Sequence, residues 1–248
     1  MATDKVCTSL INFDNLGLVQ AAEKVRILGQ QPGFSYVVTP NIDHLSRLCR
    51  KSEKALLPVY QGASLTLCDS RIINLLLKCV GKPVSSVVPG SDLTQYIFEH
   101  ILDASNKILV VGGEEEKIKS LKQRYPFLNI NHINPSMGFI HKEDEVADLI
   151  ASIKSLQPEY IFLAVGSPRQ EILAQKLVTQ GISNGVALCV GASINFITGY
   201  EKRAPGWMQH LGLEWFYRML QDPGRLVKRY SMNALYLPKI LVSLAKER

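Results

Sequence analysis

The chain alternates between short apolar runs and segments with helical spacing, and this alternation constrains the fold more than any other feature. Runs such as KILVV (107–111) and YIFLAV (160–165) are apolar along almost their whole length, which indicates strands that are buried on both faces. Segments between such runs, for example 71–80 and 170–180, carry apolar residues at helical intervals. Strands that alternate with helices predict a mainly parallel sheet covered by helices. We therefore expect a Rossmann-like α/β sandwich.

The same patterns give the expected elements in order. Strands are predicted at 35–38, 57–60, 64–67, 107–111, 128–133, 160–165 and 186–190, and helices at 42–49, 71–80, 91–102, 114–125, 142–156 and 170–180. With 248 residues and 46% apolar content, the chain is long enough for one large α/β domain with an appendage. We expect residues 1–199 to form the α/β domain and residues 200–248 to form a helical appendage.

The C-terminal segment, residues 201–248, combines positive charge with aromatic side chains. It contains nine Lys and Arg residues but only four Asp and Glu residues, although the whole chain has a net charge of +6. Its aromatic residues include Trp207, Trp215, Phe216 and Tyr217. Basic and aromatic side chains together suit an anionic surface that is partly apolar. The segment is therefore expected to meet either lipid headgroups or a nucleic acid.

Features that bear on the cellular compartment favour a cytosolic protein. The N-terminal sequence MATDKVCTSLINFD lacks the basic and then apolar pattern of an export signal. The uncharged stretch 177–200 is interrupted by polar residues such as Asn184 and Asn195, unlike a membrane-spanning helix. Five cysteines without CxxC spacing indicate reduced thiols. If the protein meets a membrane, we expect it to lie on the surface.

Sequence patterns for metal ions and common cofactors are absent. The five histidines are scattered, without HxH or HExxH spacing, and no DxD pair ends a predicted strand. Neither GxGxxG nor GxxxxGK[ST] occurs, so a standard dinucleotide or phosphate-loop site is not supported. We expect no metal and no cofactor.

Polar residues gather where predicted strands pass into helices. In a parallel sheet the ligand lies outside the carboxyl ends of the strands, which directs attention to these turns. They are TPN (39–41), CDS (68–70), VGG (111–113), GSPRQE (166–171) and VGASIN (190–195). VGG is a weak candidate for phosphate because three glutamates follow it.

The GSPRQE turn is the clearest candidate for binding an anion. Gly166 permits a tight exit from the strand, Ser167 is placed to cap the helix, and Gln170 would complete a Ser-x-x-Gln capping box. Free N–H groups at a helix start attract phosphate, and Arg169 adds positive charge. The alternative is a well-capped helix with a solvated arginine.

Two further turns allow a structural and a functional interpretation. Asp69 is either the cap of the following helix, a role that Ser70 could also fill, or a carboxylate at a strand end, suited to accept a proton from a hydroxyl. Thr39 with Pro40 is either a helix start or, with Asn41, a hydrogen-bonding set for a sugar or base. Spacing alone leaves both choices open.

These residues, taken in order, resemble the WecG/TagA/CpsF family of glycosyltransferases. The resemblance covers about residues 35–230 and rests on TPNIDHL (39–45), the Asp69 turn, GKPVSSVVPGSDL (81–93), VGG, GSPRQE, VGASINFITGYEKRAPGW (190–207) and LGLEWFYRMLQDPGRL (211–226). It implies a bacterial enzyme that transfers a sugar from a UDP-sugar to a saccharide linked to polyprenyl diphosphate, with inversion and without a metal ion. Such enzymes act at the inner face of the cytoplasmic membrane in wall, capsule or exopolysaccharide synthesis. The UDP-sugar is a substrate; N-acetylmannosamine, its uronic acid and glucose all remain open.

The resemblance also implies roles for particular residues. Asp69 would be the general base that activates the acceptor hydroxyl. The implied substrate-binding residues are Thr39, Asn41, Gly166, Ser167, Arg169, Gln170, Glu171, Asn195, Arg203, Arg218, Arg225 and Lys228. Of these, Arg218, Arg225 and Lys228 would neutralise the leaving UDP or the lipid diphosphate, which some cation must do without a metal.

Two positions depart from the family pattern. Ser70 follows Asp69 where the family usually has glycine, so the backbone is expected to approach a ligand less closely. Asn195 stands where the family often has aspartate, which bears on base recognition and on the choice of donor.

Two other functions compete with the transferase. The first is a membrane-surface module without enzymatic activity, which binds a nucleotide and anionic lipid. The second is a nucleic-acid binder, but the C-terminal segment contains no recognisable module for that role. The sequence leaves a homo-oligomer open, since a short appendage often packs on a neighbouring subunit.

Overall fold

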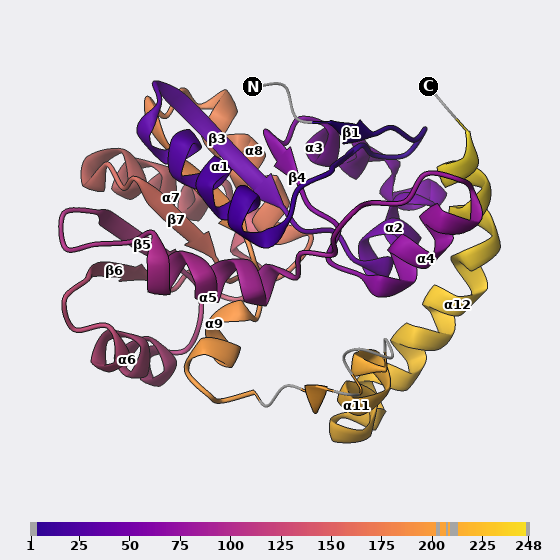
Figure 1. Cartoon of the computed structure of the whole chain (residues 1–248). Helices are drawn as coiled ribbons and strands as arrows, with labels where there is room; N and C mark the ends of the chain where they lie inside the picture. Colours follow the sequence, from indigo (N-terminus) through magenta and orange to yellow (C-terminus); the bar gives the residue numbers. More distant parts are fainter. Residues whose placement is uncertain (1–3, 202–203, 207, 209–212, 247–248) are drawn as a thin grey trace.

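The structure is a computed structural model of the chain and describes residues 4–201, 204–206, 208 and 213–246, with the side chain of Arg225 also left out. Its centre is a six-stranded parallel sheet with the order β4-β3-β8-β7-β5-β6 (Figure 1). The strands are β3 (Gly33–Val38), β4 (Leu65–Thr66), β5 (Lys107–Val111), β6 (Asn129–Ile133), β7 (Tyr160–Leu163) and β8 (Asn184–Cys189). A short antiparallel pair, β1 (Lys5–Val6) and β2 (Phe13–Asp14), precedes it.

Helices cover both faces of this sheet, as Figure 1 shows. The described helices are α1 (Leu18–Gln30), α2 (Ile42–Leu48), α3 (Leu57–Gln61), α4 (Arg71–Cys79), α5 (Gly90–His100), α6 (Glu115–Arg124), α7 (Glu143–Leu156), α8 (Arg169–Thr179), α9 (Ser193–Ile197), α11 (Glu214–Gln221) and α12 (Pro223–Ala245), with 3-10 turns η1 (Lys51–Leu56) and η2 (Phe139–His141). One hydrophobic cluster joins the sheet to α2, α4, α7 and α8, and the other joins it to α1, α5, α6 and α9. The expected α/β sandwich is confirmed.

Strand β5 shows why the apolar runs form the centre. Leu109 and Val111 lie in one hydrophobic cluster, whereas Ile108 and Val110 lie in the other. All four are fully buried, and burying an apolar side chain of this size contributes about 1.5–3 kcal/mol. A strand that is apolar at every position therefore belongs between two layers of helices.

Some local predictions are wrong. Residues 57–60 form helix α3 rather than a strand, with Pro58 in the first helical turn, where its missing N–H costs nothing. The patterns also miss α1, which packs against α5, and the short helix α9, which begins within the polar turn VGASIN (190–195).

The C-terminal helices differ in how they meet the body. Figure 1 shows α12 running along α4 and α2, while α11 lies below them. Ile240 and Leu244 of α12 are fully buried in the same cluster as α2. Ser9 N–H also donates to the Lys246 carbonyl at 2.9 Å. The division at residue 199 stays a prediction, but the C-terminal half of α12 is part of the hydrophobic core.

A helix that crosses a bilayer must be long and predominantly apolar. None of the described helices has the combination of length and apolar character that such a crossing needs.

Candidate active site

The crevice at the carboxyl ends of β3 and β8 is where the strand order changes direction. The chain runs from β3 outward to β4, and the later strands return toward β3 from the other side. Ligands bind at such a switch point in open α/β sheets. Val38 and Cys189 are paired at the ends of the two strands, and the Thr39 hydroxyl donates to the Cys189 carbonyl at 3.4 Å. Thr39 therefore lies at the base of the crevice.

Asp69 lies at the same edge, in the turn after β4. Its N–H donates to the Pro40 carbonyl at 3.1 Å, which joins the turns after β3 and β4. The cap of α4 is Ser70, whose hydroxyl accepts the Ile73 N–H at 3.3 Å. Because Ser70 satisfies the helix start, the Asp69 carboxylate does not serve as the cap. The functional interpretation of this aspartate is thereby favoured over the structural one.

The N-terminus of α5 completes the surroundings of Asp69. The carboxylate accepts a hydrogen bond from the Gly90 N–H. Gly90 leaves little room, because a Cβ there would lie 2.8 Å from the Thr39 hydroxyl oxygen and 3.6 Å from that of Ser193. Thr39, Gly90 and Ser193 thus form a tight polar group beside Asp69.

The half-buried Asp69 carboxyl group has an unusual pKa. Burial raises this pKa to about 8, while the Gly90 N–H and the charge of Arg218 act in the opposite direction. Glu214 and Asp92 raise the pKa further through charge repulsion. A carboxylate with a pKa near the working pH is well matched to accepting a proton.

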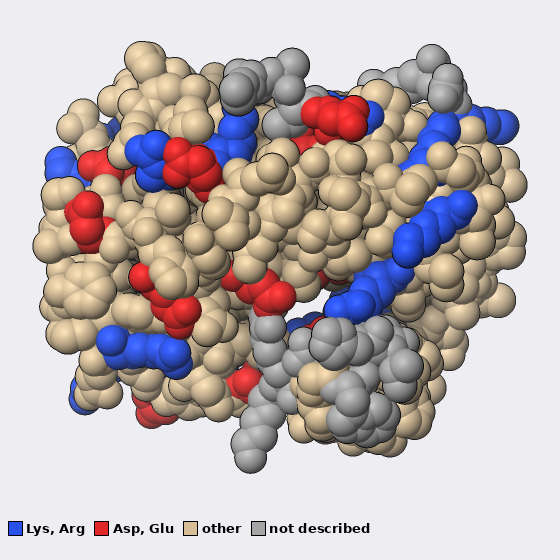
Figure 2. Space-filling view, viewed as in Figure 1, with Lys and Arg blue, Asp and Glu red and all other residues tan. Residues whose placement is uncertain are grey.

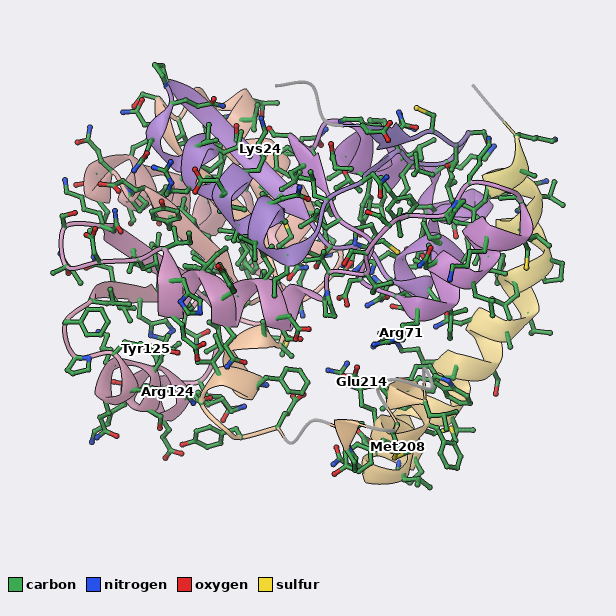
Figure 3. The ribbon with its side chains drawn as sticks, viewed as in Figure 1. Lys24, Arg71, Arg124, Tyr125, Met208 and Glu214 are labelled. Atoms are coloured by element: carbon green, nitrogen blue, oxygen red, sulfur yellow. The ribbon has the colours of Figure 1, made fainter. Side chains whose placement is uncertain are left out.

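Helix α11 approaches the crevice from the other side. The guanidinium of Arg218 lies 4.8 Å from the centre of the Phe196 ring on α9, and its Nε is 3.8 Å from a carboxylate oxygen of Glu214. Figure 3 shows the side chains of Arg71 and Glu214 directed toward one another across the opening. Figure 2 shows a hollow here, with acidic side chains on one margin and basic side chains on the other. Arg218 is the basic residue of α11 whose positive charge acts on Asp69.

The GSPRQE turn differs from its prediction. Gly166 adopts a φ of 77°, as a tight exit requires, but α8 begins at Arg169 without any side-chain cap. The Ser167 hydroxyl lies 3.3 Å from the Tyr60 hydroxyl, and the Ser167 carbonyl accepts from Arg47 at 3.1 Å. The predicted Ser-x-x-Gln capping box is therefore wrong, because the Ser167 hydroxyl that would form the cap contacts Tyr60 instead.

The next two residues of this turn point inward. Gln170 and Glu171 are only 4% and 2% exposed. The Gln170 Nε2 donates to Glu171 Oε1 at 2.9 Å, and the Gln170 Oε1 accepts from the Gly191 N–H at 3.0 Å. Arg169 is partly exposed, with Nη1 3.3 Å from the Met137 sulfur. Arg169 is thus the member of this turn that can reach a ligand with a charge.

The remaining predicted residues are spread out. Asn41 caps α2, since its Oδ1 accepts the Asp43 N–H at 3.0 Å, and Asn195 donates to Glu201 at 2.9 Å. Lys228 is exposed on α12. Arg203, Trp207 and the side chain of Arg225 lie outside the described residues.

Four contributors to this edge of the sheet were not predicted: Gly90, Ser193, His44 and Arg47. Gly90, His44 and Ser193 fall inside the recognised runs 81–93, 39–45 and 190–207, which was the available signal. Within the described residues, no three His, Cys, Asp or Glu side chains are grouped closely enough to hold a metal ion. Burial raises the pKa of the Cys68 thiol, beside Asp69, to about 12, so this thiol is a packing group.

The chain is similar in sequence to a known family of glycosyltransferases. Residues 7–248 match a family described as the glycosyl transferase WecG/TagA/CpsF family, a wider range than the expected 35–230. A protein of Staphylococcus aureus strain MW2, named N-acetylglucosaminyldiphosphoundecaprenol N-acetyl-beta-D-mannosaminyltransferase, is 27% identical over 252 residues, which covers 99% of this chain and 94% of that protein. The proteins of the same name from strains NCTC 8325 and MRSA252 are 27% and 26% identical over the same coverage. The match includes both α11 and α12.

Proposed function

The chain belongs to the WecG/TagA/CpsF family of glycosyltransferases, and we propose that it transfers an N-acetylmannosamine-type sugar from a UDP-sugar to a saccharide linked to polyprenyl diphosphate. The names of the Staphylococcus aureus relatives support this acceptor class and this sugar. The uronic acid of N-acetylmannosamine and glucose are the competing donor sugars. The product belongs to a cell-envelope polysaccharide.

The observation that carries the proposal is the position of Asp69. This carboxylate is half-buried at the switch-point edge of the sheet, with a pKa of about 8, beside the Gly90 N–H and within the field of Arg218. As the acceptor hydroxyl oxygen attacks the anomeric carbon, Asp69 takes its proton. The bond from that carbon to the diphosphate oxygen breaks, and its electron pair leaves on UDP. Attack opposite the leaving group inverts the anomeric centre.

The charge of the departing diphosphate has to be compensated. Arg218 is the described cation whose charge reaches Asp69, and Arg169 is the cation of the GSPRQE turn. We assign Arg225 and Lys228 to the same task, on the leaving UDP or on the lipid diphosphate, and Arg203 to substrate binding. Cations beside the reacting groups stabilise a transition state in which charge develops, so no metal ion is required by the proposal.

The exposed part of the C-terminal helices supports association with the inner membrane face. Leu220, Val227, Leu235 and Val242 are between 47% and 74% exposed, and Lys228 and Lys239 are exposed on α12. Apolar and basic side chains on one helical surface favour an anionic lipid interface. We propose that the enzyme is peripheral there.

The function is tested by a donor screen. UDP-N-acetylmannosamine, its uronic acid and UDP-glucose are each offered with a short-chain polyprenyl-diphosphate-linked N-acetylglucosamine, in the presence of EDTA. We expect transfer from one donor, with an inverted anomeric configuration by NMR. Absence of transfer from every donor, or activity that requires added magnesium, would contradict the proposal.

A further inference from the structure

A buried hydrogen-bond chain begins at the turn after β3. The Asn41 N–H donates to His44 Nδ1 at 3.0 Å. A backbone N–H can only donate, so Nδ1 carries a lone pair and the proton of the neutral ring is on Nε2. Burial lowers the pKa of His44 to about 4, so the ring is neutral near pH 7. Its Nε2–H faces Glu171 Oε1 at 3.6 Å, an electrostatic contact longer than a full hydrogen bond.

A second chain begins at the turn after β8. The Gly191 N–H donates to Gln170 Oε1 at 3.0 Å and shares this proton with the Leu163 carbonyl at 3.2 Å. Because this N–H also can only donate, the orientation of the Gln170 amide is set. Its Nε2 must face Glu171, where it lies 2.9 Å from Oε1. Both chains therefore end with a donor directed at one oxygen of Glu171.

Glu171 is placed to hold the surrounding turns in position and not to contact a ligand. It is 2% exposed, and burial raises its pKa while the hydrogen bond from Gln170 opposes that rise. The Ser167 hydroxyl lowers the pKa of Glu171 as well, so donors from both Gln170 and Ser167 act on this buried carboxylate. Burying a carboxylate is costly even when it accepts hydrogen bonds. Stability alone therefore does not account for a glutamate at this position.

We propose that Glu171 is a positioning residue that locks the turns after β3, β7 and β8 in the orientation that binds the donor nucleotide. The Asn41 and Gly191 N–H groups set the tautomer of His44 and the orientation of the Gln170 amide. The carboxylate has only acceptor oxygens, so it holds the donor ends of both chains at one point. Arg47 reinforces the arrangement, since it donates to the Ser167 carbonyl at 3.1 Å. The nature of the ligand rests on the proposed function, whereas the locking of the turns does not.

Glu171→Gln tests the lock, because glutamine can present either an oxygen or an NH₂ group to Gln170. We expect the affinity for UDP to fall about tenfold, as for other coupled hydrogen-bond networks. The Gly191 amide resonance should shift in the ligand-free protein. The melting temperature without ligand should stay close to wild type, and the donor KM should rise more than kcat falls.

Two companion variants make the result specific. His44→Asn keeps an acceptor for the Asn41 N–H, but its shorter amide does not reach Glu171, so we expect a smaller loss of UDP affinity, of about threefold. Glu99→Gln is the matched control, because Gln95 donates to Glu99 at 3.0 Å on the exposed surface of α5; it should leave UDP affinity unchanged.

Each outcome decides between alternatives. Wild-type UDP affinity in Glu171→Gln, or an unmoved Gly191 resonance, would overturn the lock. If Glu171→Gln does not fold, the Gly191 resonance in His44→Asn decides instead. If the wild-type protein itself binds no UDP, the proposed function fails, while the Gly191 resonance still reports on the lock.

Discussion

Asp69 and Glu171 follow strands of the same sheet, and burial raises the pKa of both carboxyl groups, yet their surroundings give them different roles. Asp69 is half-buried at the opening and accepts one backbone N–H, from Gly90. Glu171 is 2% exposed and faces donors from Gln170 and His44. A raised pKa reports desolvation, and access to the crevice decides whether a carboxylate can exchange a proton with a substrate.

The largest expected effect comes from exchanging each carboxylate for its amide. Asp69→Asn removes the base while keeping its shape, so kcat should fall roughly 10³-fold, with UDP binding retained. Glu171→Gln should act mainly on binding. Measuring kcat and UDP affinity for both variants separates the two roles. An equal loss of kcat in the two variants would contradict the assignment of different roles to Asp69 and Glu171.

The next effect concerns the cation opposite Asp69. Arg218→Gln removes a charge that lowers the pKa of Asp69 and that we assign to the leaving diphosphate. We expect kcat to fall roughly 10²-fold, and the rising limb of the pH–rate profile to move to higher pH. Arg26→Gln on the exposed side of α1, where Arg26 pairs with Glu23 at 2.5 Å, is the control. An unchanged pH profile would mean that Arg218 does not act on Asp69.

The pH dependence of stability provides a third test. The native pKa of Asp69 is about 8, above its unfolded value of about 3.9. The stability that its proton supplies is fully present below pH 4 and is lost as pH rises toward 8. Asp69→Asn has no carboxyl group to ionise and does not show this loss. The difference in free energy of unfolding between this variant and wild type should therefore grow with pH and reach about 2 kcal/mol at pH 9, after a discount for solvent access.

Chemical denaturation at pH 5, 7 and 9 measures this difference. Asp103→Asn is the control: the Ser105 hydroxyl lowers the pKa of Asp103, so the stabilisation is lost only below about pH 4 and this variant should show no trend between pH 5 and 9. If the difference in free energy of unfolding between Asp69→Asn and wild type did not change across this range, the Asp69 carboxylate of the native protein would not be desolvated.

The smallest expected effect tests the Gly90 N–H. In Gly90→Ala the added Cβ would lie 2.8 Å from the Thr39 hydroxyl oxygen, so the start of α5 should shift away from Asp69. We expect kcat at pH 7 to fall about tenfold. Gly17→Ala serves as control, since its Cβ would meet only Gln20 at 3.7 Å. Full activity in Gly90→Ala would remove Gly90 from the surroundings of the base.

The sequence predicted what depends on local pattern and failed where distant contacts decide. The run 107–111 was recognised because it is apolar on both faces, and the turns that hold Asp69 and Gly166 were placed at the ligand edge by topology alone. The run 57–60 was too short for periodicity to distinguish helix from strand. The inward turn of Gln170 depends on Gly191, 21 positions away, and capping rules describe only neighbours.

Residue roles followed the same division. Asp69 was singled out as a strand-end carboxylate, but only the structure assigns the cap to Ser70. His44 carried no signal of its own, because its tautomer is set by the Asn41 N–H and its partner lies on α8.

The packing of α12 has a consequence for biosynthesis. Ile240 and Leu244 complete the core on the α2 side of the sheet, and the Ser9 hydroxyl donates to the Ser243 carbonyl across 234 positions. On the ribosome, that side of the nascent chain stays uncovered until Leu244 leaves the exit tunnel. Until then its apolar groups are exposed to chaperones and to aggregation, so final closure is a late event in the maturation of the enzyme.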